Sequence, residues 1–334
     1  MKELIKKLTQ IVAPSGREEI LVNTILEEVK PYIDDYEIDP LGSLIVHKKG
    51  DGKKILFDAH ADEIGLMVTY IEDNGFLRFE LIGGINPYTL ISRRVIFQNG
   101  ILGTIYYEAE KTEDLSKNLK NLSVDFLYID VGAKSKEEAR NKVKVGDMAT
   151  WKGGFVDMGS RIMAKAMDDR IACATLIEAI KRIKDPKNDL YFVFAVQEEV
   201  GLLGAKTAAY NVSPDLAIAI DVTPAFDTPK GFKRIKVALG KGVAIKIQDR
   251  SLIANKEVVR KLTEIAENNS IPYQYEILPF GGTDGGAIQL TKSGIKTGVL
   301  SIPCRYVHSP NETIDMEDYK NTINFVEKIA NEVW

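Results

Sequence analysis

Five short apolar segments of this chain each lead into a carboxylate or an imidazole. The side chains concerned are His60 and Asp62, Asp168 and Asp169, Glu198 and Glu199, Asp221, and His308. Short apolar segments of this kind are typical of buried strands in a parallel sheet. In an open α/β sheet, ligands bind beyond the carboxyl ends of the strands. The pattern therefore predicts an α/β fold in which side chains far apart in the sequence meet at one edge of the sheet.

The character of the chain changes between residues 66 and 156, where helical periodicity gives way to short alternating segments. Asn74-Gly75 and Asn99-Gly100 are strong hairpin signals within this region. Many short strands without a long helix favour a small β-barrel or sandwich. The length of 334 residues also favours two domains. We therefore predict a discontinuous α/β domain, residues 1–65 plus 157–334, interrupted by an inserted β domain, residues 66–156.

Individual elements follow from local patterns. Ser15 and Glu18 predict a capping box ahead of a helix over residues 20–29. The polar stretch over residues 108–123 predicts a surface excursion. Apolar patterns predict strands over residues 43–48, 54–60, 190–196, 215–221, 232–239, 242–249 and 297–302. The first two of these strands are joined by the turn residues Gly50-Asp51-Gly52.

Composition excludes several classes of protein. The net charge of −4, with no conspicuous basic block, argues against a nucleic-acid partner. No uninterrupted apolar stretch is long enough to span a bilayer, so we expect no membrane association. The two cysteines, Cys173 and Cys304, do not form a disulfide framework. We therefore expect reduced cysteines in or near the core of a cytoplasmic protein.

Two of the three histidines follow apolar strands beside carboxylates. A single histidine at the end of a strand is more often structural than metal-binding. His60 carries a stronger signal because Asp62 follows it, and a metal-bound imidazole usually donates its second N–H to a carboxylate. His308 ends the last apolar segment. His47 lies in an alternating segment and receives no role.

The acidic doublets allow more than one interpretation. Asp168 and Asp169 could simply stabilise the dipole of a following helix, and Asp221 could simply begin a turn. Glu198 and Glu199 are harder to explain without a ligand, because they end a strand that is apolar from residue 190 to 196. Two carboxylates at the end of a buried strand repel each other and lose hydration. A bound cation would relieve both penalties.

Taken together, these side chains suit a site for two metal ions. Imidazole and carboxylate ligands suit zinc, cobalt or manganese, and the lack of cysteine ligands argues against a structural zinc. Three carboxylates and two imidazoles are too many for one catalytic ion but suit two ions that share a bridge. Asp168, Glu199 and Asp221 with a bridging hydroxide sum to −4, which balances two divalent cations. One acid of the glutamate pair then remains to accept a proton from the bridging water.

Seven separated motifs resemble those of a known family, in the same order and over nearly the whole chain. They are HADEIG (60–65), IGGINP (82–87), IDVGAKSKEEA (129–139), AMDDR (166–170), QEEVGLLGA (197–205), GGTDGGAI (281–288) and RYVHSPNE (305–312). The chain resembles the M42 metalloaminopeptidases, the tetrahedral aminopeptidase group in the MH clan of two-zinc peptidases. Departures from the family pattern, Ala61 and residues 91–93, include no expected metal ligand.

The resemblance implies a role for each site residue. His60 and Asp221 would bind one metal, Glu199 and His308 would bind the other, and Asp168 would bridge them. The peptide bond after Asp168 would be cis. Of the remaining acids, Glu198 would be the general base and acid, and Asp62 would orient the imidazole of His60.

The resemblance also implies a fold, an assembly and an activity. The fold would be a three-layer α/β/α peptidase domain with an inserted, PDZ-like β-barrel that forms dimers, which commonly build tetrahedral dodecamers. The activity would be removal of N-terminal residues from short peptides, with zinc as the expected metal and cobalt or manganese as alternatives. Three other hypotheses remain at this stage. They are a glycoside hydrolase, since two carboxylates can also cleave sugars, a deacylase or carboxypeptidase on the same two-metal core, and a non-catalytic metal-binding protein.

Overall fold

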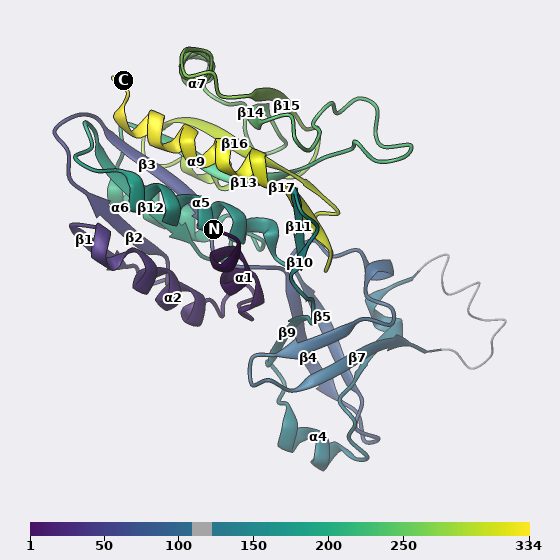
Figure 1. Ribbon diagram of the computed structural model, residues 1–334. Coiled ribbons are helices and arrows are strands. Elements are labelled where there is room, and N and C mark those ends of the chain that lie inside the picture. The colour runs from purple at the N-terminus through teal and green to yellow at the C-terminus, as the bar shows by residue number, and fades with distance from the viewer. Residues whose placement is uncertain (109–121) are drawn as a thin grey trace.

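The computed structural model describes residues 1–108 and 122–334 of the chain. It consists of a broad α/β part and a narrower β-barrel that projects from one side of it (Figure 1). The predicted α/β fold with an inserted small barrel is therefore confirmed. Most of the polar stretch over residues 108–123 lies outside the described residues. None of the described helices is long and apolar enough to cross a membrane.

The α/β part is built on one mixed sheet of eleven strands. Nine strands follow one another along the sheet in the order β1 (Asp35–Ile38), β2 (Leu44–Lys48), β12 (Asp189–Ala195), β3 (Lys54–His60), β13 (Leu216–Pro224), β16 (Lys296–Arg305), β17 (Glu312–Asp315), β11 (Arg161–Ala164) and β10 (Val156–Asp157). The other two strands branch from β16: β14 (Val243–Gln248) pairs with β16, and β15 (Tyr273–Ile277) pairs with β14. Strands β12, β3, β13 and β16 are mutually parallel. Their carboxyl ends therefore meet at one edge, as the sequence predicts.

Helices cover both faces of this sheet, because its central strands are apolar on both sides. One face packs against α1 (Lys2–Gln10), α2 (Glu19–Val29), α5 (Met167–Arg182), α7 (Lys256–Asn268) and α9 (Met316–Asn331), and a short 3-10 turn, η1 (Lys30–Tyr32), follows α2. The opposite face packs against α6 (Leu203–Val212) and α8 (Asp284–Ile288). The result is the predicted three-layer α/β/α arrangement.

Six antiparallel strands close the barrel. In order around it they are β4 (Gly65–Ile71), β5 (Leu77–Ile82), β8 (Leu127–Asp130), β7 (Leu102–Tyr107), β6 (Arg94–Phe97) and β9 (Met148–Trp151). Both predicted hairpins are present, β4 with β5 and β6 with β7. The short helices η2 (Pro87–Thr89), η4 (Val124–Phe126) and α4 (Lys136–Lys142) connect the strands. The barrel has its own apolar core. The exact domain boundaries, between residues 65 and 66 and between residues 156 and 157, stay a prediction.

Gly65 marks the point where the chain leaves the large sheet and enters the barrel. A side chain there would place Cβ 2.9 Å from both the Ala149 carbonyl oxygen and Cβ of Pro14. Only glycine fits so close an approach. The first barrel strand is thereby held directly beside the end of β3, where His60 lies.

Two local predictions are wrong. The capping box is absent. Helix α2 begins at Glu19, its N-cap residue Glu18 makes no side-chain capping bond, and the Ser15 hydroxyl instead donates to Asp62 at 2.6 Å. Residues 232–239 form no strand. Their apolar side chains Ile235 and Val237 pack into a small cluster at the base of a loop. The predicted turn at residues 50–52 does join β2 to β3, and β12 lies between these two strands in the sheet.

Candidate metal centre

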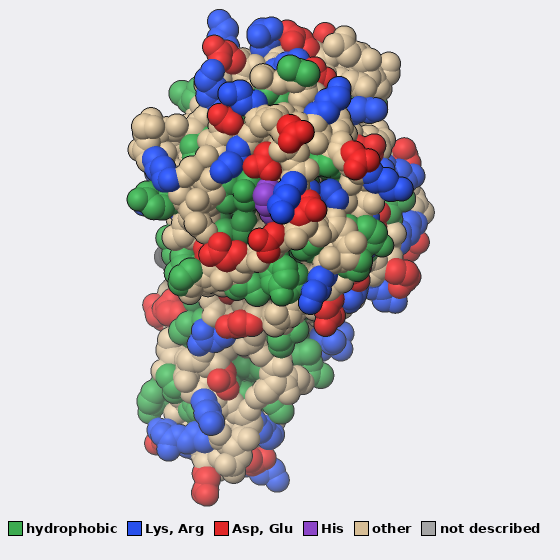
Figure 2. Space-filling view, turned by 90° about the vertical axis from the view of Figure 1, so that its left-hand side faces the viewer, with side chains coloured by type: hydrophobic (Ala, Val, Ile, Leu, Met, Phe, Trp, Pro, Cys, Tyr) green, Lys and Arg blue, Asp and Glu red, His purple; other side chains and the backbone are tan. Residues whose placement is uncertain are grey.

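A cavity of about 530 Å³ lies at the carboxyl edge of the parallel strands. All of the predicted metal ligands and the predicted base line it: His60, Asp168, Glu198, Glu199, Asp221 and His308. Figure 2 shows a histidine at the surface, with acidic side chains close by, above the narrow end of the molecule. Asp62 does not line the cavity and is fully buried behind it. The structure thus brings together every site residue predicted from the sequence.

Each side chain reaches the cavity from the end of an element. His60 is the last residue of β3, and Asp221 lies near the end of β13, the neighbouring parallel strand. Glu198 and Glu199 occupy the turn between β12 and α6. Asp168 precedes the regular part of α5, and the peptide bond joining it to Asp169 is cis, as the resemblance implies.

Asp168 faces both imidazoles of the site. Its Oδ1 lies 3.0 Å from Nε2 of His60, and its Oδ2 lies 3.3 Å from Nε2 of His308. Oε1 of Glu199 also lies 3.3 Å from Nε2 of His308. The two oxygens of this carboxylate therefore face two different imidazoles, as a ligand shared by two cations would have to do.

Asp62 contacts three of the site residues from outside the cavity. Its Oδ1 lies 3.3 Å from Nδ1 of His60 and accepts the backbone N–H of Glu198 at 3.0 Å. Its Oδ2 accepts the backbone N–H of Glu199 at 3.1 Å and the Ser15 hydroxyl at 2.6 Å. A single buried carboxylate therefore orients the imidazole and also fixes the turn that carries both glutamates.

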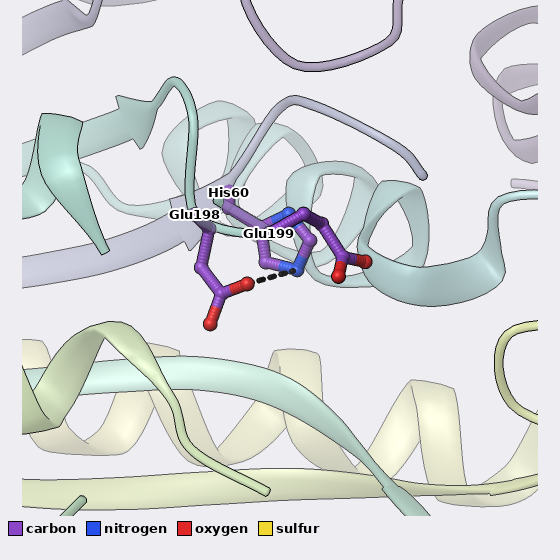
Figure 3. A group of neighbouring side chains, drawn as sticks. All are labelled: His60, Glu198 and Glu199. Carbon is purple, nitrogen blue, oxygen red and sulfur yellow. Dashed lines mark ion pairs between the residues drawn. The ribbon is translucent and has the colours of Figure 1, made fainter. Parts of the chain in front are cut away.

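Glu198 lies on the wall of the cavity beside His60. Its Oε2 is 4.0 Å from Nε2 of the imidazole, and Figure 3 shows the carboxylate facing the ring. Ligand atoms from His60, Glu198 and Glu199 all lie within 4.8 Å of one another. The side chain of Glu198 is only 10% exposed, so its carboxylate reaches the cavity while remaining largely screened from water.

The acids of the site outnumber the positive charges that face them. Burial and the neighbouring charge of Asp168 raise the pKa of Asp221 well above its usual range. Burial likewise raises the pKa of Glu198 well above normal, despite the favourable field of His60. Burial opposes protonation of His308, but Glu199 and Asp168 outweigh it and raise its pKa to about 12. The site as a whole therefore favours added positive charge.

The donor set fits two divalent cations. One group of ligand atoms comes from Asp168, Glu199 and His308, and another comes from His60, Asp169 and Asp221; within each group the atoms lie within 4.8 Å of one another. Oε1 of Glu199 is buried without a hydrogen-bond partner among the described residues. Oxygen and imidazole nitrogen ligands suit zinc and its neighbours in the first transition row.

Asp169 is more than an acid at the start of a helix. It is fully buried, and its Oδ2 accepts the backbone N–H of His60 at 3.3 Å. Burial and the nearby Asp221 raise its pKa well above normal. The helix-dipole interpretation therefore does not account for this side chain. His47, which received no role, lies away from the cavity and contacts Asp189 and Tyr191.

Sequence reasoning missed Glu312. Its Oε1 accepts the backbone N–H of His308 at 2.7 Å, and its Oε2 accepts the backbone N–H of Asp168 at 3.0 Å. This buried side chain therefore ties together the two segments that carry Asp168 and His308. It stands at the end of the motif RYVHSPNE, so a signal was present. Gly84, next to the barrel, contributes a carbonyl oxygen 2.7 Å from Nδ1 of His308.

A family model described as M42 glutamyl aminopeptidase matches residues 42–325. The chain belongs to the M42 family of aminopeptidases. It is 51% identical over 326 residues to a protein from Acetivibrio thermocellus named as an aminopeptidase, and the match covers 98% of this chain and 97% of that protein. The family is a family of hydrolases, so the chain is an enzyme, and the glycoside hydrolase and non-catalytic hypotheses give way to the aminopeptidase.

Two solved structures of peptidases match the fold closely. An aminopeptidase from the archaeon Desulfurococcus kamchatkensis has a TM-score of 0.94 and 41% identity, covering 99% of this chain and 94% of that one. The TET1 peptidase of Pyrococcus horikoshii has a TM-score of 0.88 and 38% identity, covering 99% of each chain, and it can assemble into a tetrahedron or a large octahedral shell.

Proposed function

We propose that this M42 aminopeptidase removes N-terminal residues from short peptides at a site for two divalent cations. The proposed ligands are His60 and Asp221 for one cation, Glu199 and His308 for the other, and Asp168 between them. The observation that carries the proposal is the position of Asp168, whose two oxygens face the two imidazoles at 3.0 and 3.3 Å. Zinc is the proposed metal, with cobalt and manganese as alternatives that the same ligands would accept.

Residues of the chain would carry the proton during hydrolysis. Two divalent cations, when bound, supply Lewis-acid activation of water and of the scissile carbonyl group. Glu198 is the proposed general base: its carboxylate would accept a proton from the attacking water and return it to the nitrogen of the leaving amine. Asp62 is a positioning residue, because it contacts both His60 and the backbone of Glu198 without reaching the cavity.

The acid-rich cavity would also recognise the positive charge of a free N-terminus. Electrostatic complementarity of this kind favours an α-ammonium group over a blocked, neutral terminus. The aminopeptidase assignment therefore predicts rejection of N-acetylated peptides. A deacylase or carboxypeptidase on the same core would accept them.

We further propose that the chain forms dimers through residues 66–156 and that the dimers build a tetrahedral dodecamer. The assembly of the related Pyrococcus horikoshii peptidase supports this. The barrel also exposes large apolar side chains, including Tyr70, Leu102, Tyr106 and Phe126. Light scattering coupled to gel filtration would measure the mass; a monomer at micromolar concentration would contradict the proposal.

A reducing, cytoplasmic location is proposed because both cysteines are buried and free.

A substrate panel tests the activity directly. The protein is stripped with a chelator, reconstituted with zinc, cobalt or manganese, and assayed on aminoacyl-p-nitroanilides and on matched free and N-acetylated tripeptides. We expect no activity in the stripped protein, recovery with metal, and hydrolysis of free peptides only. Full activity after stripping, or equal rates on acetylated peptides, would contradict the proposed function.

A further inference from the structure

The loop between β13 and β14, residues 225–242, concentrates positive charge. It carries five exposed cationic side chains, which are Lys230, Lys233, Arg234, Lys236 and Lys241, and one acid, Asp227. Asp227 is neutralised by Arg305, whose Nε and one terminal nitrogen each lie 2.7 Å from a carboxylate oxygen. Figure 1 shows this loop projecting beyond β14 and β15. The five cations have no ion-pair partner within residues 1–108 and 122–334.

Hydrogen bonds tether the base of the loop. Asp227 accepts the backbone N–H of Leu239 at 3.2 Å, which closes the base of the loop. Gln274 on β15 bonds both backbone groups of Ala238, at 3.1 and 3.0 Å. At the tip, Gly231 passes so close to the Phe226 carbonyl that a Cβ would lie 1.9 Å from its oxygen. The positive side chains are therefore presented from a tethered backbone.

A hollow of about 340 Å³ lies within this loop. Two aromatic rings, three lysines and one acid are among the side chains that line it: Phe226, Phe232, Lys230, Lys233, Lys236 and Asp227, and the acid is paired with Arg305. The rings pack edge to face with centroids 6.0 Å apart. An apolar base with a cationic rim can accommodate a carboxylate-bearing side chain, since the stem packs on the rings and the charge meets the lysines.

The hollow adjoins the catalytic cavity. Phe226 packs edge to face on Phe280, with centroids 6.3 Å apart, and Phe280 lines the catalytic cavity. Leu278 also lines that cavity and belongs to the same apolar cluster as Ile235 and Val237 of the loop. A peptide with its N-terminus at the metal centre could therefore extend directly toward the loop.

The two neighbouring sites have opposite charge. The catalytic cavity is rich in carboxylates and would hold the free amino terminus, whereas the hollow is rich in lysines. We propose that the hollow of loop 225–242 binds acidic side chains of the substrate downstream of the scissile bond, so that the enzyme prefers peptides with Asp or Glu in that segment. This inference rests on the proposed function. It concerns the residues after the cleaved bond and leaves the preferred N-terminal residue open.

Peptides with a common N-terminal Leu-Ala and a downstream segment of four residues test the proposal. The segment is all Glu, all Gln or all Lys, and Leu-p-nitroanilide serves as a substrate that has no downstream segment. At low ionic strength we expect kcat/KM about tenfold higher for the Glu peptide than for the Gln peptide, and lowest for the Lys peptide. The difference should shrink at 0.5 M salt, since screening weakens exposed charge pairs.

The double variant Lys233→Gln/Lys236→Gln assigns the preference to the loop. It should lose most of the advantage of the Glu peptide and keep wild-type kcat/KM on the Gln peptide and on Leu-p-nitroanilide. The matched control is Lys184→Gln/Lys187→Gln, which removes two exposed lysines from the turn before β12, at the end of that strand remote from Glu198. This control should retain the full preference.

Three results would overturn the proposal. They are equal kcat/KM for Glu and Gln peptides in the wild type, an unchanged preference in the double variant, and inhibition by a short single-stranded oligonucleotide without any effect of acidic peptides. Failure of the proposed function would look different, because the reconstituted wild type would then hydrolyse neither Leu-p-nitroanilide nor any free peptide.

Discussion

Replacement of Asp62 by asparagine should damage the metal centre without touching the cavity. The carboxylate accepts three hydrogen bonds, from the backbone N–H groups of Glu198 and Glu199 and from the Ser15 hydroxyl, and it faces Nδ1 of His60. Asparagine keeps one acceptor oxygen and places an NH2 group at the other position. Whichever way the amide is oriented, one buried backbone N–H therefore loses its acceptor.

The structure gives the size of both effects. A buried donor without a partner costs about 1–3 kcal/mol, so the free energy of unfolding of the metal-free protein should fall by that amount. Loss of the carboxylate that orients a ligating imidazole typically weakens metal binding about 10–100-fold. The weakened site should be the one that includes His60.

Denaturant titration of the metal-free protein and calorimetric titration with zinc would measure the two effects separately. Ser15→Ala is the matched control, because it removes one hydrogen bond to the same carboxylate, costs about 1 kcal/mol and leaves the contact with His60 in place. Wild-type stability together with wild-type zinc affinity in Asp62→Asn would refute the positioning role of this residue.

Three further predictions follow from other buried groups. Glu198→Gln should bind metal with near wild-type affinity but lose about 10²–10⁴-fold in kcat, measured on Leu-p-nitroanilide; near wild-type turnover would remove it from the mechanism. Lys165→Met should destabilise the fold by about 1.5–3 kcal/mol in denaturant titration, because buried Glu63 loses its cation at 2.7 Å and keeps only Arg170 at 3.4 Å; a loss below 1 kcal/mol would contradict this. Burial raises the pKa of Asp318 to about 6, so the folded state binds this proton more tightly than the unfolded state does, and stability falls as pH rises from about 4 to 7. Asp318→Asn should remove about 1 kcal/mol of that fall between pH 5 and 7. If the free energy of unfolding changes equally with pH in the variant and in the wild type, the prediction is contradicted.

The sequence was most informative where residue type and strand period act together. Apolar strands that end in His60, Glu198-Glu199 or Asp221 fix both the parallel sheet and the edge at which the side chains meet. The strand predictions over residues 54–60 and 215–221 therefore placed two of the proposed ligands, His60 and Asp221, as well as the strands themselves.

Local patterns failed where tertiary contacts decide the outcome. Ser15 has the right residue type and spacing for a helix cap, but its hydroxyl is used by Asp62, a partner 47 residues away. Apolar and polar side chains alternate over residues 232–239 as they would in a strand. These residues nevertheless form no strand and belong to the loop of residues 225–242. Glu312 could not be assigned a role from spacing alone, because its two backbone donors come from different segments of the chain.

Elemental analysis of the fully reconstituted protein tests the two-cation site most directly. We expect two zinc ions per chain in the wild type, and fewer than two in Asp168→Ala, which removes the carboxylate lying between the imidazoles of His60 and His308. One ion or none in the wild type, or two tightly held ions in Asp168→Ala, would contradict it.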